Sequence, residues 1–551
     1  MTAGQIDNRV ANGGEPPLIA ALHRAGCYPH PVRDVRMLET HISWVLLTGD
    51  WAYKIKKPVN LGFLDFSTLE ARRHFCEEEL RLNRRLAPRI YETVVEIRGT
   101  PDAPRVEGGG PILEYAVKMR EFPQTALASS MLARGELAPQ HVDQLAETIA
   151  AFHMRAERAD EASPFGAPDA VLAVALQNFE QLLPCVTGAA DRNTLQSLRA
   201  WTEREFSARK KALAARRRQG AVRECHGDLH LRNIAVLDGR PVAFDCIEFN
   251  DQLRWIDVMS EAAFLLMDLE DRGRRDLAWR FLNAYLEATG DYPGIDVLRF
   301  YLVYRALVRA KVHALRARQP HIEDAERLRL DGVVREYLGL AARFAAPPAS
   351  SLIITHGVSG SGKTSATQSL LGHLGAVRVR SDIERKRLHG FPALAQSGSG
   401  PGTGIYTSAA TAATYDRLLL LARLIVAAGF PAVVDAAFLQ RGERDAFRAL
   451  ASTLHVPFLI LAFDAPEAML RERVAQRLGS AADASEADLA VLERQLAFRE
   501  TIASEESAAV IRIDTRRSLS PTVWESVLQR LSGPSHQDDI HPSARHSSAS
   551  E

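Results

Sequence analysis

The sequence of 551 residues lacks several features that mark specialised classes of protein. No stretch reaches the roughly 18 unbroken apolar residues of a membrane span. The N-terminus has no basic segment followed by an apolar run, which is the pattern of a signal peptide. The five cysteines form no Cys-x-x-Cys pair, which is typical of reduced thiols. We therefore expect a cytoplasmic protein that makes no membrane contact.

An excess of either charge is also absent, because Lys plus Arg and Asp plus Glu both number 68. A large nucleic-acid-binding surface needs an excess of positive charge, so the balance argues against a nucleic-acid partner and leaves only a local basic groove open. The composition, 46% hydrophobic and 25% charged, is ordinary for globular protein. The chain is too long for one core, and its length favours two to four domains.

Composition also suggests where the domains begin and end. Residues 1–16 are polar and predict a flexible lead-in, and residues 533–551 are too poor in apolar side chains to order a tail. The segment AAPPAS at 345–350 contains two prolines and predicts a short stiff linker. These boundaries define a first domain at 17–344 and a second at 351–532.

The first domain begins with strands and continues with helices. A hairpin is expected over Ile42–Val59 and a further strand over Ile112–Met119. Between them Ser67 predicts a helix N-cap, with Glu70 at the capping-box spacing. The remainder reads as helical apart from a strand-rich segment at Glu224–Glu248. The second domain alternates strands with helices, which predicts an α/β fold with a mainly parallel sheet covered on both faces.

The most specific motif opens the second domain. GVSGSGKT at 357–364 matches G-x-x-x-x-G-K-[S/T] and lies between an apolar strand and an amphipathic helix. Its glycines let backbone amides face phosphate groups, and the helix N-terminus adds partial positive charge. Lys363 is expected to contact the β- and γ-phosphates, and the Thr364 hydroxyl to hold Mg²⁺. The predicted ATP-binding residues of this loop are Gly357, Val358, Ser359, Gly360, Ser361, Gly362, Lys363 and Thr364.

Acids follow two later strands of this domain. Asp382 stands at the carboxyl end of a strand, where ligands bind in such sheets, and is placed to accept a proton from a substrate hydroxyl. Arg385 lies one helical turn further on the same face and is a candidate substrate contact. The alternative is a capping aspartate with a surface arginine. Asp435 ends another strand, which suits a carboxylate beside Mg²⁺, although a turn acid would also fit.

Three arginines, Arg471, Arg473 and Arg477, precede a small polar loop and could close over the phosphates as a lid. A solvated helix face is the competing interpretation. We select Arg477 as a candidate ATP-binding residue. Together these motifs resemble the P-loop small-molecule and polynucleotide kinases, including gluconate-kinase-like, zeta-toxin-like and polynucleotide-kinase-like proteins. The resemblance spans about residues 351–530. It implies that Asp382 activates the acceptor hydroxyl, and it leaves the acceptor open.

A second constellation lies in the first domain. His-Gly-Asp-Leu-His-Leu-Arg-Asn at 226–233 is followed by Asp245 at the end of an apolar strand. Phosphoryl transfer needs a carboxylate near the attacking hydroxyl and oxygen ligands for Mg²⁺. Asp228 fits the first role, and Asn233 and Asp245 fit the second. The alternative is a degenerate copy of such a site.

A cation on an upstream strand should hold the α- and β-phosphates, and a helix glutamate should pair with it. Lys54 is the first candidate and Lys56 its rival, while Glu79 is preferred to Glu78. This arrangement resembles the aminoglycoside phosphotransferase and choline-kinase branch of the protein-kinase-like fold, over about residues 17–342. The resemblance implies a bilobal α+β domain that binds adenine near Met119–Phe122.

One part of that family pattern is missing, because no G-x-G-x-x-G loop precedes Lys54 and residues 39–43 (ETHIS) occupy its place. Our first hypothesis is a tandem kinase that uses ATP and Mg²⁺ to phosphorylate a hydroxyl of a small molecule. A second is that the N-terminal domain is a non-catalytic ligand sensor that regulates the P-loop domain. A third is a polynucleotide 5′-hydroxyl kinase.

Overall fold

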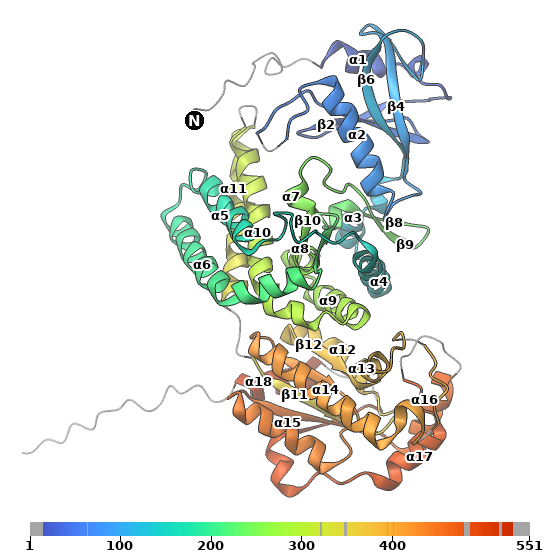
Figure 1. The fold of residues 1–551 in the computed structure, drawn as a ribbon, viewed down its shortest axis with the longest axis vertical. Helices are drawn as coiled ribbons and strands as arrows, with labels where there is room; N and C mark the ends of the chain where they lie inside the picture. Colours follow the sequence, from blue (N-terminus) through green and yellow to red (C-terminus); the bar gives the residue numbers. More distant parts are fainter. Residues whose placement is uncertain are drawn as a thin grey trace, which may run out of the picture. The chain divides into compact units, whose positions relative to one another are not determined.

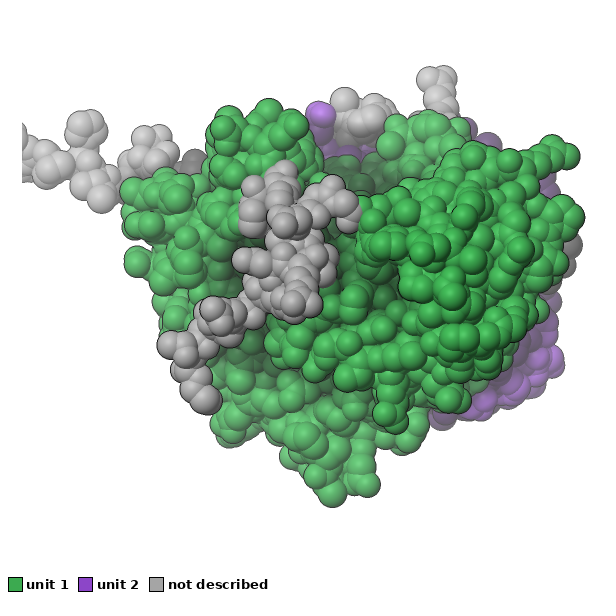
Figure 2. Space-filling view, turned by 90° about the horizontal axis from the view of Figure 1, so that it is seen from above, with its two compact units in different colours: residues 1–274, 297–346 green, residues 275–296, 347–551 purple. Residues whose placement is uncertain are grey.

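The computed structural model describes residues 15–62, 64–319, 322–346, 350–393, 395–400, 402–478, 485–516 and 521–532. Most of the predicted lead-in, half of the predicted linker and the whole predicted tail lie outside these ranges. The chain divides into two compact units, which Figure 2 colours separately: unit 1 comprises residues 1–274 and 297–346, and unit 2 comprises residues 275–296 and 347–551. Within the described ranges, no helix combines the length and the apolar character needed to cross a membrane.

Unit 1 opens with an antiparallel six-stranded sheet in the order β1-β2-β3-β6-β4-β5 (Figure 1). Its strands are β1 (Arg36–Glu39), β2 (Ser43–Leu47), β3 (Trp51–Lys56), β4 (Tyr91–Thr100), β5 (Ala103–Val106) and β6 (Ile112–Arg120). Helix α2 (Leu69–Asn83) packs on β4 and β6. Thr68 caps this helix, because its hydroxyl accepts a hydrogen bond of 3.1 Å from the Ala71 amide. The predicted cap at Ser67 is therefore wrong by one residue.

The rest of unit 1 is helical around two short two-stranded ribbons, as the order of sequence patterns predicts. One ribbon pairs β7 (Val222–Glu224) with β10 (Trp255–Asp257), and the other pairs β8 (Ile234–Leu237) with β9 (Arg240–Ala243). The helices are α1 (Pro17–Leu22), α3 (Ala128–Ala133), α4 (Pro139–Arg155), α5 (Pro168–Leu182), α6 (Ala189–Arg218), α7 (Asp251–Arg254), α8 (Val258–Asp271), α10 (Ile295–Ala317) and α11 (Asp324–Ala345). Helix α8 is buried along nearly its whole length and forms the core of this lobe.

Unit 2 has the predicted parallel sheet, with five strands in the order β12-β13-β11-β14-β15. The strands are β11 (Leu352–His356), β12 (Val377–Arg380), β13 (Ala432–Asp435), β14 (Phe458–Asp464) and β15 (Val510–Asp514). The helices are α9 (Arg275–Thr289), α12 (Lys363–Leu374), α13 (Ser381–Leu388), α14 (Ser408–Ala427), α15 (Arg441–Thr453), α16 (Glu467–Leu478), α17 (Leu489–Phe498) and α18 (Pro521–Ser532). Helices α9, α12 and α18 pack together, and α14 packs with α15, so both faces are covered.

Helix α9 belongs to unit 2 although it precedes the Pro-rich segment by more than fifty residues of sequence. Its Asn283 side chain donates a hydrogen bond of 3.0 Å to the Ala376 carbonyl and accepts one of 2.6 Å from the Arg378 amide. These bonds satisfy the outer backbone groups at the start of β12, an edge strand. The compact unit around the P-loop is therefore discontinuous in sequence, whereas the composition suggests a single boundary at 345–350.

Candidate functional sites

The P-loop runs from the end of β11 to the first turn of α12, as its strand–loop–helix context predicts. Gly357, Gly360 and Gly362 have φ values of 151°, 81° and 86°, which favour glycine. A Cβ at Gly360 would lie 2.7 Å from the Leu470 carbonyl oxygen, so a side chain at this position would collide with α16. The loop therefore needs glycine both for its turn and for its contact with the neighbouring helix.

The two polar side chains that end the P-loop are held by different partners. Lys363 Nζ donates to the carbonyl oxygens of Gly357 and Val358, at 2.8 and 3.0 Å, and so lies across its own loop. Thr364 Oγ1 donates a hydrogen bond of 2.7 Å to Asp435 Oδ2, at the end of the adjacent strand β13. The structure thus brings Thr364 and Asp435 together, which are the two oxygen ligands predicted for Mg²⁺ in this unit.

A cavity of about 1180 Å³ opens above the P-loop. Its lining includes P-loop residues, the predicted substrate residues and several side chains that sequence reasoning did not select. The predicted residues that line it are Ser359, Gly360, Gly362, Lys363, Thr364, Asp382, Arg385, Asp435 and Arg473. The cavity is large enough for a nucleotide together with a second small molecule.

Asp382 and Arg385 lie in the first turns of α13, directly after β12. Asp382 is partly exposed in the cavity. The Arg385 side chain is buried, and its Nη1 donates to the Ile405 carbonyl and to Thr411 Oγ1, at 3.0 and 3.1 Å. Its Nε has no hydrogen-bond partner among the described residues. Arg385 is therefore fixed in place while it retains a donor, which a solvated surface arginine would not do.

The three arginines proposed for a lid have different surroundings. Arg473 donates to the Gly360 carbonyl at 3.3 Å and to Thr515, so it fastens α16 to the P-loop. Arg471 is half-exposed and pairs with glutamates, which fits a solvated helix face. The side chain of Arg477 lies outside the described residues, so its role stays a prediction.

The cation predicted to grip phosphate in unit 1 lies on β3. Lys54 Nζ donates to Glu79 at 2.8 Å and to Asp245 at 2.6 Å. Lys56 also contacts Glu79, at 2.8 Å, but its second partner is Glu248 and its side chain is 0% exposed. Burial opposes ionisation of Glu79, but the two lysines outweigh it and lower the pKa of this carboxyl group to about 2. Both rival lysines meet the preferred glutamate, and only Lys54 also meets Asp245.

The catalytic-loop residues of unit 1 converge as the motif predicts. Asn233 Nδ2 donates to the carbonyl oxygen and to Oδ2 of Asp228, both at 3.0 Å, and His230 Nε2 lies 3.3 Å from the same carboxylate. Burial opposes ionisation of Asp228, yet interaction with His230 and Arg309 holds its pKa below the ordinary value. Asp245 has a φ of 66° and a side chain 42% exposed. The Phe244 ring lies 5.3 Å from that of Phe122, at the predicted adenine segment.

A buried glutamate supports this loop from below. Glu261 on α8 accepts hydrogen bonds from the amides of His226 and Gly227, at 3.1 and 2.6 Å, and from His153 at 2.8 Å. Gly227 has a φ of 90°, and a Cβ there would lie 2.8 Å from the Leu253 carbonyl. The backbone of the loop that carries Asp228 is therefore hydrogen-bonded to a charged side chain in the core.

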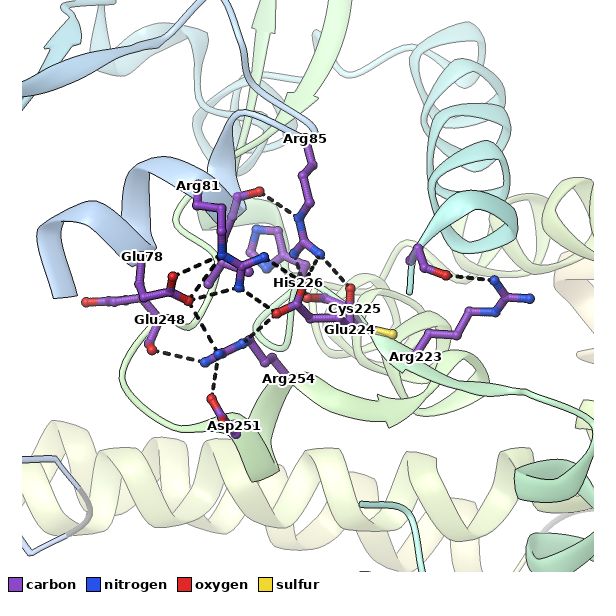
Figure 3. Close-up of polar contacts among 12 residues, drawn as sticks. Glu78, Arg81, Arg85, Arg223, Glu224, Cys225, His226, Glu248, Asp251 and Arg254 are labelled. Atoms are coloured by element: carbon purple, nitrogen blue, oxygen red, sulfur yellow. Dashed lines mark hydrogen bonds and ion pairs between the residues drawn. The ribbon is translucent and has the colours of Figure 1, made fainter. Parts of the chain in front are cut away.

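A cluster of arginines around Glu224 connects helix α2 to the same loop. Arg81, Arg85 and Arg254 converge on the Glu224 carboxylate at 2.7, 2.9 and 3.3 Å (Figure 3). Arg85 also donates to the Cys225 carbonyl at 3.1 Å. Because α2 carries Glu79, this cluster fixes the lysine–glutamate pair relative to the loop that begins at His226. Sequence reasoning missed Glu224, and only its place directly before the His-Gly-Asp motif could have indicated it.

Family comparisons match two different families to the two parts of the chain, and the first match also extends over residues 275–296, which belong to unit 2. Residues 68–301 match the model of the phosphotransferase enzyme family, and residues 352–502 match that of an AAA domain. With the fold, these matches define the class of protein: an ATP-dependent phosphotransferase that acts on small molecules. An uncharacterised protein of Mycobacterium tuberculosis (strain H37Rv) is 31% identical over 462 residues, which cover 83% of this chain and 90% of that protein. A protein of Mycobacterium bovis matches equally. The chain belongs to the family of these mycobacterial proteins.

Solved kinase structures are similar to parts of this chain. An amicoumacin kinase in complex with AMP-PNP is 12% identical, covers 55% of this chain and 88% of its own, and gives a TM-score of 0.35. A gluconokinase from Sinorhizobium meliloti is 23% identical, covers 34% of this chain and 93% of its own, and gives a TM-score of 0.23.

Proposed function

We propose that each unit transfers the γ-phosphoryl group of ATP to a hydroxyl of a small molecule, so that the chain is a tandem kinase. The observation that carries this proposal is the Thr364–Asp435 hydrogen bond at the mouth of a cavity that also contains Lys363 and Asp382. A phosphate grip, a pair of oxygen ligands and a free carboxylate are the parts that phosphoryl transfer requires.

In unit 2 the proposed reaction uses Asp382 as the proton acceptor. The acceptor hydroxyl loses its proton to Asp382, its oxygen forms a bond to the γ-phosphorus, and the bond from that phosphorus to the β–γ bridging oxygen breaks to release ADP. Lys363 and the loop amides take up the charge on the phosphate oxygens. Arg385 positions the acceptor through the donor that it retains.

Mg²⁺ fits both sites, because the donors that converge are the hard oxygens this ion prefers. In unit 2 the ligands would be Thr364 and Asp435, and in unit 1 Asn233 and Asp245. When bound, the ion neutralises phosphate charge. The exposure of Asp245 argues against a purely structural role. A carboxylate that served only to pair with Lys54 could be buried, as Glu79 is.

In unit 1 Asp228 has the corresponding role. Its low pKa keeps it ionised and makes it a weak base, which suits a loose transition state in which the hydroxyl proton leaves late. Asn233 fixes the carboxylate, and Lys54, held by Glu79, would contact the α- and β-phosphates.

The experiment compares the whole chain with Lys363→Ala and Asp228→Ala variants. Phosphate transfer from labelled ATP is measured across a panel of sugars, nucleosides and oligonucleotides. We expect each variant to abolish a different product. If neither lowers transfer to any acceptor, the proposal is wrong. A product formed only from oligonucleotides would favour the polynucleotide kinase instead.

One observation favours the sensor hypothesis as a second candidate for unit 1. The glycine-free segment between β1 and β2 is a tight turn, in which Thr40 Oγ1 accepts a hydrogen bond of 3.0 Å from the Ser43 amide. So short a turn offers few amides to cover phosphates. Magnesium-dependent ATP binding to the Lys363→Ala chain without any product that depends on Asp228 would support the sensor. The whole chain is needed, because residues 275–296 form part of unit 2.

A further inference from the structure

We propose that the acceptor of unit 1 carries an anionic group, a phosphate ester or a carboxylate, which binds Arg232, Arg309 and His313 beside Asp228. This inference rests on the proposed kinase function of that unit and adds the chemical class of its substrate. It does not follow from the family resemblance, since an aminoglycoside or choline acceptor is cationic.

One face of helix α10 is lined with cationic side chains. Arg305, Arg309, His313 and Arg316 follow one another at spacings of three or four residues, which places them along a single stripe. Two of them are already engaged. Arg305 donates to the Gly227 carbonyl at 3.1 Å and to Ser260, and Arg316 pairs with Glu326 at 3.3 Å. Among the described residues, the middle pair, Arg309 and His313, forms no direct ion pair with a carboxylate.

Each member of that middle pair has one buried nitrogen without a hydrogen-bond partner among the described residues. Arg309 is 9% exposed, its Nε is one of these atoms, and its Nη2 lies 3.5 Å from His313 Nε2. His313 Nδ1 is also buried without a partner, and its ring stacks on Tyr337, which bonds to Arg309. Buried donors are nearly always satisfied in native proteins, so these groups indicate a ligand or ordered water.

A third cation approaches from the catalytic loop. Arg232 lies in the short 3-10 helix Leu231–Asn233 and forms no hydrogen bond or ion pair with the residues that the structure describes. Its charge instead interacts with those of Arg309, Arg272 and Arg316, and with that of the Asp268 carboxylate.

Two nearby carboxylates, Asp228 and Asp268, offset part of the charge of this group, since both interact electrostatically with Arg309. Asp268 Oδ2 accepts from the Leu231 amide at 2.9 Å and pairs with Arg272 at 3.3 Å, and among the described residues it makes no direct bond to Arg232 or Arg309. Like charges held together in a partly buried place disfavour one another, and a bound anion would remove that repulsion. The same field would repel a cationic acceptor, which gives the site selectivity as well as affinity.

The position relative to Asp228 suits an acceptor with two functional ends. Arg309 interacts electrostatically with Asp228. Arg232 lies four residues after Asp228 in the same loop. The Asp228 side chain is 35% exposed. An anion at the arginines would therefore leave the remainder of a short polyol within reach of the Asp228 carboxylate.

The test measures binding to the whole chain by isothermal titration calorimetry. A nonhydrolysable ATP analogue and Mg²⁺ are present at saturation, so that both nucleotide sites are blocked. Ribose 5-phosphate, ribonate and ribose are titrated in parallel, and these three probes distinguish a phosphate, a carboxylate and a neutral acceptor. Arg232→Gln and Arg309→Gln are compared with Lys210→Gln, because Lys210 is an exposed lysine that pairs with Asp169.

We expect at least one anion to bind and ribose not to bind. Each arginine variant should weaken the anion about tenfold or more, and Lys210→Gln should leave it unchanged. If Arg309→Gln does not fold, the Arg232→Gln variant alone tests the proposal, because Arg232 is exposed. The inference is overturned if neither anion binds, if ribose binds as tightly, or if Arg232→Gln has no effect.

An Asp228→Asn variant separates this inference from the proposed function. We expect it to retain anion binding and to lose transfer. Anion binding without Asp228-dependent transfer to any acceptor would sustain the anion site and contradict the kinase activity of unit 1. Asp228-dependent transfer to neutral acceptors alone, with no anion binding, would support the kinase activity of unit 1 and contradict the anion site.

Discussion

Thr364 and Asp435, which are 71 residues apart, are joined by a hydrogen bond of 2.7 Å between the P-loop helix and the end of β13. We predict that Asp435→Asn weakens Mg²⁺-dependent ATP use by unit 2 about 10- to 100-fold, because the amide cannot supply the charge that both Thr364 and a divalent ion require. The measurement is the Mg²⁺ concentration that gives half-maximal transfer.

The matched control for this prediction is Thr364→Ser, which keeps the hydroxyl. Its Mg²⁺ dependence should stay close to that of the parent chain. An Asp435→Asn protein with an unchanged Mg²⁺ requirement would show that Asp435 only caps the loop.

Lys54 and Lys56 both pair with Glu79, but replacing each with methionine should affect a different property of unit 1. Lys54→Met removes the cation beside the exposed Asp245, so we expect nucleotide affinity and transfer by unit 1 to fall. Lys56→Met leaves the buried Glu248 without its direct lysine partner and Glu79 with Lys54 alone, so we expect the free energy of unfolding to fall by about 3 kcal/mol. Nucleotide titration and calorimetric unfolding measure the two effects.

A Lys57→Met variant is the control for this pair, since Lys57 meets Glu39 at the surface side of the same strand end. It should change neither quantity appreciably. If Lys54→Met instead caused the larger loss of stability and left ATP binding intact, the assignment of the two lysines would have to be exchanged.

The sequence predicts the parts of these sites that local geometry determines. Residues 357–364 form one strand–turn–helix unit, so their spacing alone indicates which backbone groups face a phosphate. Asp435 is also predictable, because the carboxyl ends of neighbouring parallel strands meet at one edge. The same holds for Asp228 and Asn233, which share one short loop. Strands β4 and β5 were missed, although β4 is rich in β-branched residues that could have indicated it.

Other features depend on contacts between distant segments, and no local pattern carries them. Gln495 and Thr515 reach the P-loop from 136 and 154 residues away along the chain. Helix α9 has an ordinary amphipathic pattern, and only its contacts with α12 and β12, among them those of Asn283, assign it to unit 2. In the sequence, Glu224 cannot be distinguished from any other acidic residue in a strand. Only the structure shows that three arginines surround it. Such groupings need the folded chain.

A glutamine side chain is hydrogen-bonded to one of the P-loop amides that are expected to bind phosphate. Gln495 Oε1 accepts a hydrogen bond of 2.7 Å from the Ser359 amide, which lines the cavity. Phosphate must displace this oxygen to bind the loop. We predict that Gln495→Ala raises the ATP affinity of unit 2 about two- to tenfold, which corresponds to one ordinary hydrogen bond. Fluorescent nucleotide titration of the Lys54→Met chain, in which unit 1 is expected to bind nucleotide weakly, measures it.

Gln476→Ala is the control, because Gln476 is exposed on α16 and bonds only to its own helix at Glu472. It should not alter ATP affinity. A drop in affinity for Gln495→Ala would mean that this side chain binds the nucleotide itself.

The final prediction concerns acid stability and Glu261. Burial opposes the ionisation of this side chain, but hydrogen bonds from His153 and the loop amides lower its pKa from 4.5 to about 2. Between these values the unfolded chain binds a proton at this position that the folded chain does not. The resulting stabilisation is therefore complete above pH 4.5 and is lost as the pH falls through 2.

We accordingly expect Glu261→Gln to lower the free energy of unfolding of unit 1 by about 3 kcal/mol at pH 7, and the difference from the parent chain to shrink steadily between pH 4.5 and 2. Calorimetric unfolding across this range measures it, with the exposed Glu203→Gln as a control that should shift by at most about 0.5 kcal/mol. Transfer that depends on Asp228 should fall as well, because the amides of His226 and Gly227 lose their anionic acceptor. A difference that did not vary with pH would show that Glu261 acts through its shape and not through its charge.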